Sequence, residues 1–171
     1  MGDALVELLH ENEFDEITVQ DVLDRAGVGR STFYAHYRDK EDLFLSDVED
    51  FLERVCEMLN KQKANPSRLL PVQELFAHIR EMREFHKGLM RSGKMKEVEM
   101  LGRGYFARSI EARLQAAGVQ MTAARRSAQA YALAGSLFSL LDWWVDKGMR
   151  VEPREMDLLF HQMAWKGLAA K

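Results

Sequence analysis

Apolar residues recur three or four positions apart over most of the chain, a spacing that places them along one face of an α-helix. The N-terminal part contains three short segments of this kind, at about residues 3–11, 19–26 and 29–36. A longer segment covers residues 39–61, and the pattern resumes after Pro71. With three prolines in 171 residues and abundant Leu, Ala, Glu, Arg and Met, the chain is predicted to be all-α.

Turn and capping residues divide this pattern into elements. Acids at Asp39 and Asp42 suit the start of the long helix, and two prolines in residues 61–71 predict a connecting loop. After this loop we predict a helix from Pro71 to about Leu89 and a break at Ser92 and Gly93. Two short helices follow over residues 95–101 and 105–117, the first ended by Gly102 and Gly104 and the second by Gly118. A long helix then runs from Thr122 to about Gly148, and Pro153 opens the last helix. We expect an N-terminal head, residues 1–45, and a C-terminal body, residues 46–171.

Residues 17–44 carry the signals of two short helices joined by a tight turn. Thr18 is a candidate N-cap, and Gly27 can adopt the positive φ that a sharp turn requires. Phe33 and Tyr37 stand four positions apart and are expected to point into a small core. Two helices around such a turn, with polar and basic side chains on the second, predict a DNA-reading helix-turn-helix within a three-helix head.

The side chains left outside this small core are the candidate DNA-binding residues: Thr18, Arg30, Ser31, Thr32, Tyr34, His36 and Lys40. Arg30 is the best candidate for a bidentate contact to guanine, and Ser31 and Thr32 suit close contact with bases or phosphate. Tyr34 and His36 are expected to touch phosphate, as are Thr18 and Lys40 at helix starts. The alternative is that all are solvated residues of an ordinary three-helix domain.

The same segment resembles the DNA-binding domain of the TetR (tetracycline repressor) family of transcriptional regulators. The matching motifs are F-D-E-I-T-V (residues 14–19), R-A-G-V (25–28), S-T-F-Y-x-H-Y (31–37) and D-K-E-x-L (39–43), about a quarter of the chain. The resemblance implies a ligand-responsive DNA-binding regulator, most often a repressor, that binds a palindromic operator in double-stranded DNA as a homodimer. Heads of this family usually have a longer first helix with basic residues ahead of it, so we expect either that the natural N-terminus is longer or that Met1 is an alternative start.

For the body, the resemblance implies a helical dimerisation and ligand-binding domain. In this family the last two helices pair with their two-fold mates, and small residues at Ala128, Ala132, Gly135, Ser136 and Ser139 would let another helix approach closely. The resemblance also implies a pocket for a small-molecule effector that the sequence does not name. Its candidate lining residues are Phe76, Ile79, Phe85, Met100, Tyr105, Phe106, Phe138 and Trp144. Ordinary core packing within one chain is the alternative for both features.

Charge is spread unevenly along the chain. The net formal charge is −3, but residues 1–54 contain fifteen acidic and five basic residues and carry −10, which leaves +7 on the remainder. Because contacts to phosphate supply much of the affinity for DNA, this is the wrong sign for a DNA-binding head. Residues 26–38, however, contain no acid. The charge therefore keeps open an alternative function, a co-regulator of the same fold that acts through protein partners and has lost DNA binding.

Other classes of protein are disfavoured. The chain has no run of roughly 18 uncharged apolar residues that would span a membrane, and no export signal at its start. Its single cysteine, Cys56, cannot form an internal disulfide, so we expect a reduced, cytoplasmic protein. No glycine-rich phosphate loop, HExxH motif or cysteine pair is present, so we predict neither an enzyme nor a cofactor. Glu74, His78 and Glu81 have helical spacing, but a surface histidine is commoner than a metal ligand there.

Overall fold

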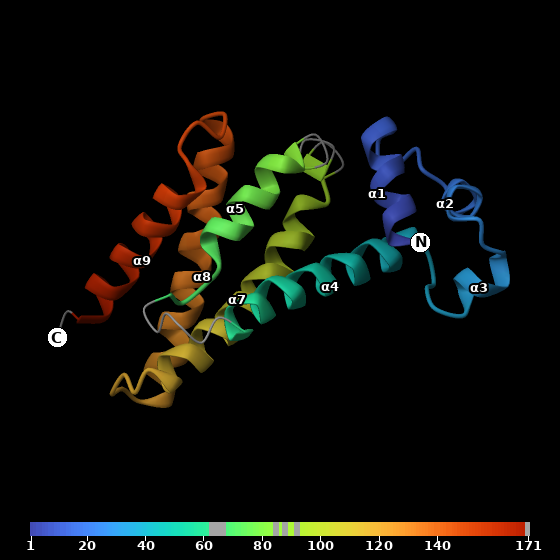
Figure 1. Ribbon diagram of the computed structural model, residues 1–171. Helices are drawn as coiled ribbons and strands as arrows, with labels where there is room; N and C mark the ends of the chain where they lie inside the picture. Colours follow the sequence, from blue (N-terminus) through green and yellow to red (C-terminus); the bar gives the residue numbers. More distant parts are fainter. Residues whose placement is uncertain (62–67, 84–85, 87–88, 91–92, 170–171) are drawn as a thin grey trace. The chain divides into compact units, whose positions relative to one another are not determined.

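The computed structural model describes residues 1–61, 68–83, 86, 89–90 and 93–169, and every regular element within these residues is an α-helix (Figure 1). The elements are α1 (Gly2–Glu11), α2 (Val19–Ala26), α3 (Arg30–Tyr34), α4 (Lys40–Lys61), α5 (Val72–Glu81), α7 (Met95–Ala116), α8 (Ala123–Asp146) and α9 (Pro153–Ala169). The predicted all-α fold is confirmed. Among the described residues, no helix is both long and apolar enough to cross a membrane.

The chain divides into two compact units. The first unit combines residues 1–51 with residues 82–98, and the second unit combines residues 52–81 with residues 99–171. Each has its own set of buried side chains, and both α4 and α7 contribute residues to each unit. The predicted division into a head and a body at residues 45 and 46 stays a prediction.

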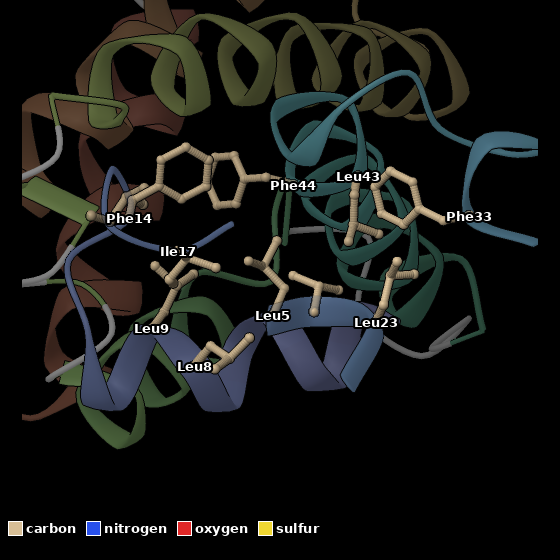
Figure 2. Close-up of a cluster of buried hydrophobic side chains, with 11 residues drawn as sticks. Leu5, Leu8, Leu9, Phe14, Ile17, Leu23, Phe33, Leu43 and Phe44 are labelled. Carbon is tan, nitrogen blue, oxygen red and sulfur yellow. The ribbon is translucent and has the colours of Figure 1, made fainter. Parts of the chain in front are cut away.

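The core of the first unit is built from apolar side chains of α1 to α4 and of the connections between them. Figure 2 shows the labelled side chains converging on one another. Its buried members are Leu5, Leu8, Leu9, Phe14, Ile17, Val22, Leu23, Phe33, Leu43, Phe44 and Leu89. Phe14 and Phe44 meet edge to face, with ring centroids 5.4 Å apart, an arrangement that aromatic rings prefer. Leu89 shows that the later segment, residues 82–98, helps to complete this core.

Local chemistry explains where α2 and α4 begin and where α2 ends. Thr18 and Asp21 form a capping box, in which each side chain bonds the backbone amide of the other. Gly27 ends α2 with φ 66°, a left-handed conformation that costs glycine little because it has no Cβ atom. At the start of α4, the Asp39 carboxylate accepts from the amide of Asp42 at 2.7 Å. The predicted caps and turn are therefore confirmed.

The prediction that glycines divide residues 95–117 into two helices is wrong. The helix α7 runs without interruption through Gly102 and Gly104. Gly102 is buried, and a Cβ atom placed there would lie 2.5 Å from Cζ of Phe138 on α8. The missing side chain at residue 102 therefore lets the Phe138 ring pack against the α7 backbone. The sequence also predicts one helix from Pro71 to about Leu89. This prediction is wrong in part, because α5 ends at Glu81.

A partly buried polar network ties the residues before α5 to α9. The Arg68 guanidinium donates to both Glu74 oxygens at 3.0 and 2.6 Å and to Asp157 at 2.8 Å, and its hydrogen bonds hold the pKa of Glu74 below its ordinary value. The amide of Leu69 donates to Nε2 of His161 at 2.9 Å, and Nδ1 of the same ring lies 2.7 Å from the carbonyl oxygen of Asp157. These bonds position α9 within the second unit.

The close approach at Gly102 predicts different responses at the two glycines of α7. Gly102→Ala should lower the free energy of unfolding by about 1–3 kcal/mol, because the new methyl group must displace the Phe138 ring. Gly104→Ala is the matched control, since its nearest neighbour is the flexible end of Arg108 at 3.7 Å. This control should be neutral or stabilising by up to about 1 kcal/mol through helix propensity. Urea unfolding measures both, and equal stability of the two variants would contradict the packing argument.

Candidate nucleic-acid interface

The side chains of α3, and those of His36 and Tyr37 after it, are divided between the buried core and the exposed surface. Phe33 is fully buried, and its ring lies 5.7 Å from that of half-buried Tyr37, which agrees with the prediction that both belong to the core. The remaining predicted DNA-binding residues of this segment are exposed: Arg30, Ser31, Thr32, Tyr34 and His36. A single buried anchor thus holds a five-residue helix whose other side chains face outward.

Thr18 is exposed, but its hydroxyl is already engaged. Oγ1 donates to Oδ2 of Asp21 at 2.6 Å and accepts from the backbone amide of Asp21 at 3.2 Å. The hydroxyl and the backbone amide of Thr18 both donate to the Asp21 carboxylate, and these two bonds hold the pKa of that carboxyl below its ordinary value. Thr18 therefore fixes the start of α2, and its predicted phosphate contact stays a prediction.

Lys40 lies half-buried at the first position of α4, where its ammonium group is bound by backbone carbonyls. Nζ donates to the carbonyls of Phe14 at 2.7 Å, Ile17 at 2.6 Å and Asp15 at 3.3 Å. It also lies 4.8 Å from the centroid of the Phe14 ring, within the range of a cation–π contact. In this arrangement Lys40 joins the α1–α2 connection to α4. Its predicted contact with DNA phosphate would require some of these bonds to be released.

Two of the arginines in the first unit are neutralised by carboxylates. Arg25 on α2 bonds Glu11 at 2.8 Å and Glu7 at 3.3 Å, both on α1, and its hydrogen bond keeps the pKa of Glu11 below the ordinary value. Arg38 pairs with Asp42 at 3.0 Å, and that bond similarly lowers the pKa of the aspartate. Part of the large acidic charge of this region is therefore taken up by internal ion pairs.

Arg30 differs from these cations because its partner is neutral. Its Nε and Nη2 atoms donate to Oε1 of Gln20 on α2 at 3.2 and 2.8 Å. The other lysine and arginines of residues 1–51, a range described in full, bond to carboxylates or to backbone carbonyls. Among the described residues, no carboxylate forms an ion pair with Arg30, which lies on the exposed side of α3. Sequence reasoning missed Gln20, because no local pattern signals a side-chain contact between residues ten positions apart.

The residues predicted to line a ligand pocket lie in the second unit, apart from Phe85, which lies outside the described residues. Five are buried (Phe76, Ile79, Phe106, Phe138 and Trp144), Tyr105 is half-buried, and Met100 is 73% exposed. Ring centroids are 4.9 Å apart for Phe76 and Trp144 and 5.9 Å apart for Phe106 and Phe138. The buried members therefore pack in the core of this unit, and the predicted pocket stays a prediction.

Features that would suggest metal or thiol chemistry are weak. Within the described parts of the chain, no three His, Cys, Asp or Glu side chains are grouped so that they could hold a metal ion. Glu74, one of the three residues with suggestive spacing, is bonded to Arg68. Burial raises the pKa of the Cys56 thiol, which disfavours the reactive thiolate form.

Comparison with known proteins identifies the N-terminal region. The profile of "Bacterial regulatory proteins, tetR family" matches residues 3–46. The "Fatty acid metabolism regulator protein" of Bacillus subtilis (strain 168) is 33% identical over 72 residues. That match covers 40% of this chain and 37% of the length of the Bacillus protein.

Solved structures of regulators share the fold over almost the whole chain. The dihydroxyacetone kinase operon activator DhaS has a TM-score of 0.72 at 13% identity, over 98% of this chain and 93% of its own. A TetR transcriptional regulator from Streptococcus agalactiae 2603V has a TM-score of 0.67 at 24% identity, over 95% and 90%. The fatty acid degradation regulator FadR from Bacillus halodurans has a TM-score of 0.69 at 16% identity, over 99% and 93%. At these identities the likeness establishes the fold.

The bonds of Lys40 predict that it contributes to stability. Lys40→Met should lower the free energy of unfolding by about 1–3 kcal/mol, because carbonyl acceptors in the α1–α2 connection lose their donor. The matched control is Arg38→Met, which removes an equal charge from a highly exposed side chain two residues earlier. Chemical denaturation should show a clear loss for the first variant and a much smaller change for the second. Similar midpoints for both variants and the wild type would contradict the role of Lys40 as an internal brace.

Proposed function

This chain belongs to the tetR family of bacterial regulatory proteins, and we propose that it is a ligand-responsive transcriptional repressor that binds a palindromic operator as a homodimer. The family and the structural neighbours are regulators of transcription and not enzymes, in line with the sequence analysis. One observation carries the proposal for DNA. The exposed side of α3 gathers hydrogen-bonding groups around Arg30, with which no carboxylate of the described residues forms an ion pair.

Within the proposed interface, the length and chemistry of each side chain determine whether it contacts bases or phosphates. Arg30 reads a guanine through its guanidinium, while Ser31 and Thr32 make close contacts with bases or phosphate. Tyr34, which is 55% exposed, and His36 bind phosphate and fix the position of α3 on the duplex. Thr18 and Lys40 hold the starts of α2 and α4, where a phosphate contact would add to their structural bonds.

Exposed apolar side chains on α8 and α9 support the proposed homodimer. These side chains are Tyr131, Trp143, Leu158, Leu159 and Met163, each at least 42% exposed in the single chain. Large exposed apolar side chains on the same two helices favour an interaction surface there. A stable dimer buries on the order of 1,200–2,000 Å² in total, which two helices per chain can supply.

The serines of α8 fit the same proposal. The hydroxyl of Ser139 donates to the carbonyl of Gly135 at 3.2 Å, and that of Ser136 donates to the carbonyl of Leu133 at 2.8 Å. Because these hydroxyls are satisfied by their own helix, they would not be left unpaired beneath a partner helix. Small side chains at Ala128 and Ala132 would allow that helix to approach closely.

In the proposed mechanism, the homodimer presents two recognition helices to half-sites that lie about one helical turn apart, or a multiple of it. The acidic surroundings make binding by one head weak, so affinity depends on both heads binding together. An effector in the body regulates the protein by binding one arrangement of the heads more tightly than another. If it enters among the buried rings of the second unit, it must separate the pairs Phe76–Trp144 or Phe106–Phe138, which favours an apolar ligand group.

The proposed interface predicts the behaviour of substitutions on α3. The DNA for this test is the duplex sequence that the wild-type protein selects from a random pool. Arg30→Ala should bind this operator roughly tenfold to hundredfold more weakly, and it should be less selective at one base pair per half-site. Tyr34→Phe should lose less, and equally for all sequences, because a phosphate contact carries no base information. Fluorescence anisotropy at rising salt measures both effects.

The control for this experiment is Arg125→Ala, which removes an exposed arginine from the start of α8. It should bind as the wild type does. Wild-type affinity in Arg30→Ala would refute the assignment of α3. The absence of any salt-sensitive binding by the wild-type protein would favour a co-regulator that acts through protein partners, a function that the acidic head also suits.

The exposed apolar residues predict the oligomeric state and how to disrupt it. At micromolar concentration the wild-type protein should sediment as two chains per particle. Leu159→Glu should weaken the dimer by at least roughly a hundredfold, because it would bury an unpaired carboxylate at the contact. Met100→Glu is the control, since it places the same charge on an exposed apolar residue of α7 and should leave the dimer intact. A monomeric wild type, or a Leu159→Glu dimer of unchanged strength, would rule out this interface.

A further inference from the structure

Gln20 on α2 is bonded to Arg30 in a way that fixes the guanidinium group. Oε1 of Gln20 accepts from Nε and Nη2 of Arg30 at 3.2 and 2.8 Å, and Nε2 of Gln20 donates to Oδ1 of Asp24 at 2.8 Å. We propose that Gln20 is a positioning residue for operator recognition, which holds Arg30 so that the outer edge of its guanidinium meets one base pair in each half-site. This inference rests on the proposed function, because it requires Arg30 to contact DNA.

The chemistry of its neighbours allows only one orientation of the Gln20 amide. A guanidinium can only donate hydrogen bonds, so the amide oxygen must face Arg30. An ionised carboxylate can only accept them, so the amide nitrogen must face Asp24. The reversed orientation would set donor against donor and acceptor against acceptor. The chain from Asp24 through Gln20 to Arg30 therefore has a defined direction, and it limits the rotation of both longer side chains.

The same bonds leave the reading edge of Arg30 available. Gln20 occupies Nε and one proton of Nη2, whereas Nη1 and the other Nη2 proton remain at the outer edge of the guanidinium. That edge can donate to the O6 and N7 atoms of guanine together. Gln20 is neutral, so it orients Arg30 without cancelling its charge. The carboxylates bonded to Arg25 and Arg38 do cancel the charges of those arginines.

Positioning matters here because arginine is long and α3 is short. Arg30 is the first residue of a five-residue helix, and its side chain is exposed. Without Gln20 it would sample many rotamers, and much of that freedom would be lost on binding DNA. A guanidinium that is already oriented loses less freedom and tolerates fewer alternative bases. Gln20 should therefore affect base selectivity as well as affinity.

The test compares Gln20 variants in two backgrounds, with affinity and base preference measured on operator DNA carrying each base at the position read by Arg30. Gln20→Ala should weaken binding to the preferred operator by about 3- to 10-fold and flatten the base preference at that position. Gln20→Glu should weaken binding further and reduce the salt dependence, since a carboxylate would neutralise Arg30. Glu16→Ala, at an exposed residue outside the helices, is the control and should leave the base preference unchanged.

Double mutants separate positioning from direct contact. In the Arg30→Ala background, Gln20→Ala should have no further effect, because the side chain that it positions is absent. A further loss of affinity in that background would show that Gln20 acts on DNA independently, and it would overturn the positioning role. Unchanged base preference in Gln20→Ala with Arg30 intact would overturn that role too. In contrast, wild-type binding by Arg30→Ala would refute the underlying assignment of Arg30 as well.

A measurement without DNA distinguishes these failures. In ¹⁵N NMR spectra of the free protein, the Arg30 Nε–H signal should exchange slowly with water in the wild type and rapidly in Gln20→Ala. Slow exchange together with an unchanged base preference would mean that the bond exists but does not serve recognition, which refutes the positioning role alone. Rapid exchange in the wild type would refute the bond itself. Thermal unfolding of Gln20→Ala should match that of Glu16→Ala, because both side chains are exposed.

Discussion

The burial of Phe33 is the contact on which the recognition region depends. A helix of five residues is not stable alone in water, because the cost of starting a helix exceeds what so few hydrogen bonds return. Phe33 is fully buried among side chains of the first unit, so the core supplies the stability that α3 lacks. Figure 2 shows Phe33 with Leu43 and Leu23 in this cluster. Because Phe33 is the buried anchor of α3, the other side chains of this helix are exposed and available for binding.

Ion pairs between individual side chains, and not the net charge, determine which charges of the first unit are offset. A count of residues 1–54 gives −10, which alone would argue against a DNA-binding surface. The structure shows that Glu7, Glu11 and Asp42 are bonded to arginines, and that Asp21 caps a helix. Arg30 instead bonds a neutral amide. A small acidic domain can therefore offer one effective cation in a defined place, although its overall field still opposes DNA.

Those features that depend on neighbours in the sequence could be predicted from it. The caps at Thr18 and Asp39, the turn at Gly27 and the buried ring of Phe33 follow from local chemistry and helical spacing, and all are confirmed. The continuity of α7 could not be predicted, because a glycine that ends a helix and one that admits the ring of a distant residue look alike in sequence. The bonds of Lys40 to carbonyls 23 to 26 positions away, and of Arg30 to Gln20, likewise depend on tertiary geometry.

The hydrogen-bonded pair of Gln20 and Arg30 has a consequence for how relatives of this protein diverge. If Arg30 reads a base as proposed, a change at position 20 alone would release an arginine that still favours the old base, and a change at position 30 alone would leave an amide with nothing to orient. Either single step would then cost recognition before it gains a new preference. New operator preferences should therefore arise in lineages where both positions change together, and the two positions should covary across descendants while the buried ring of Phe33 stays aromatic.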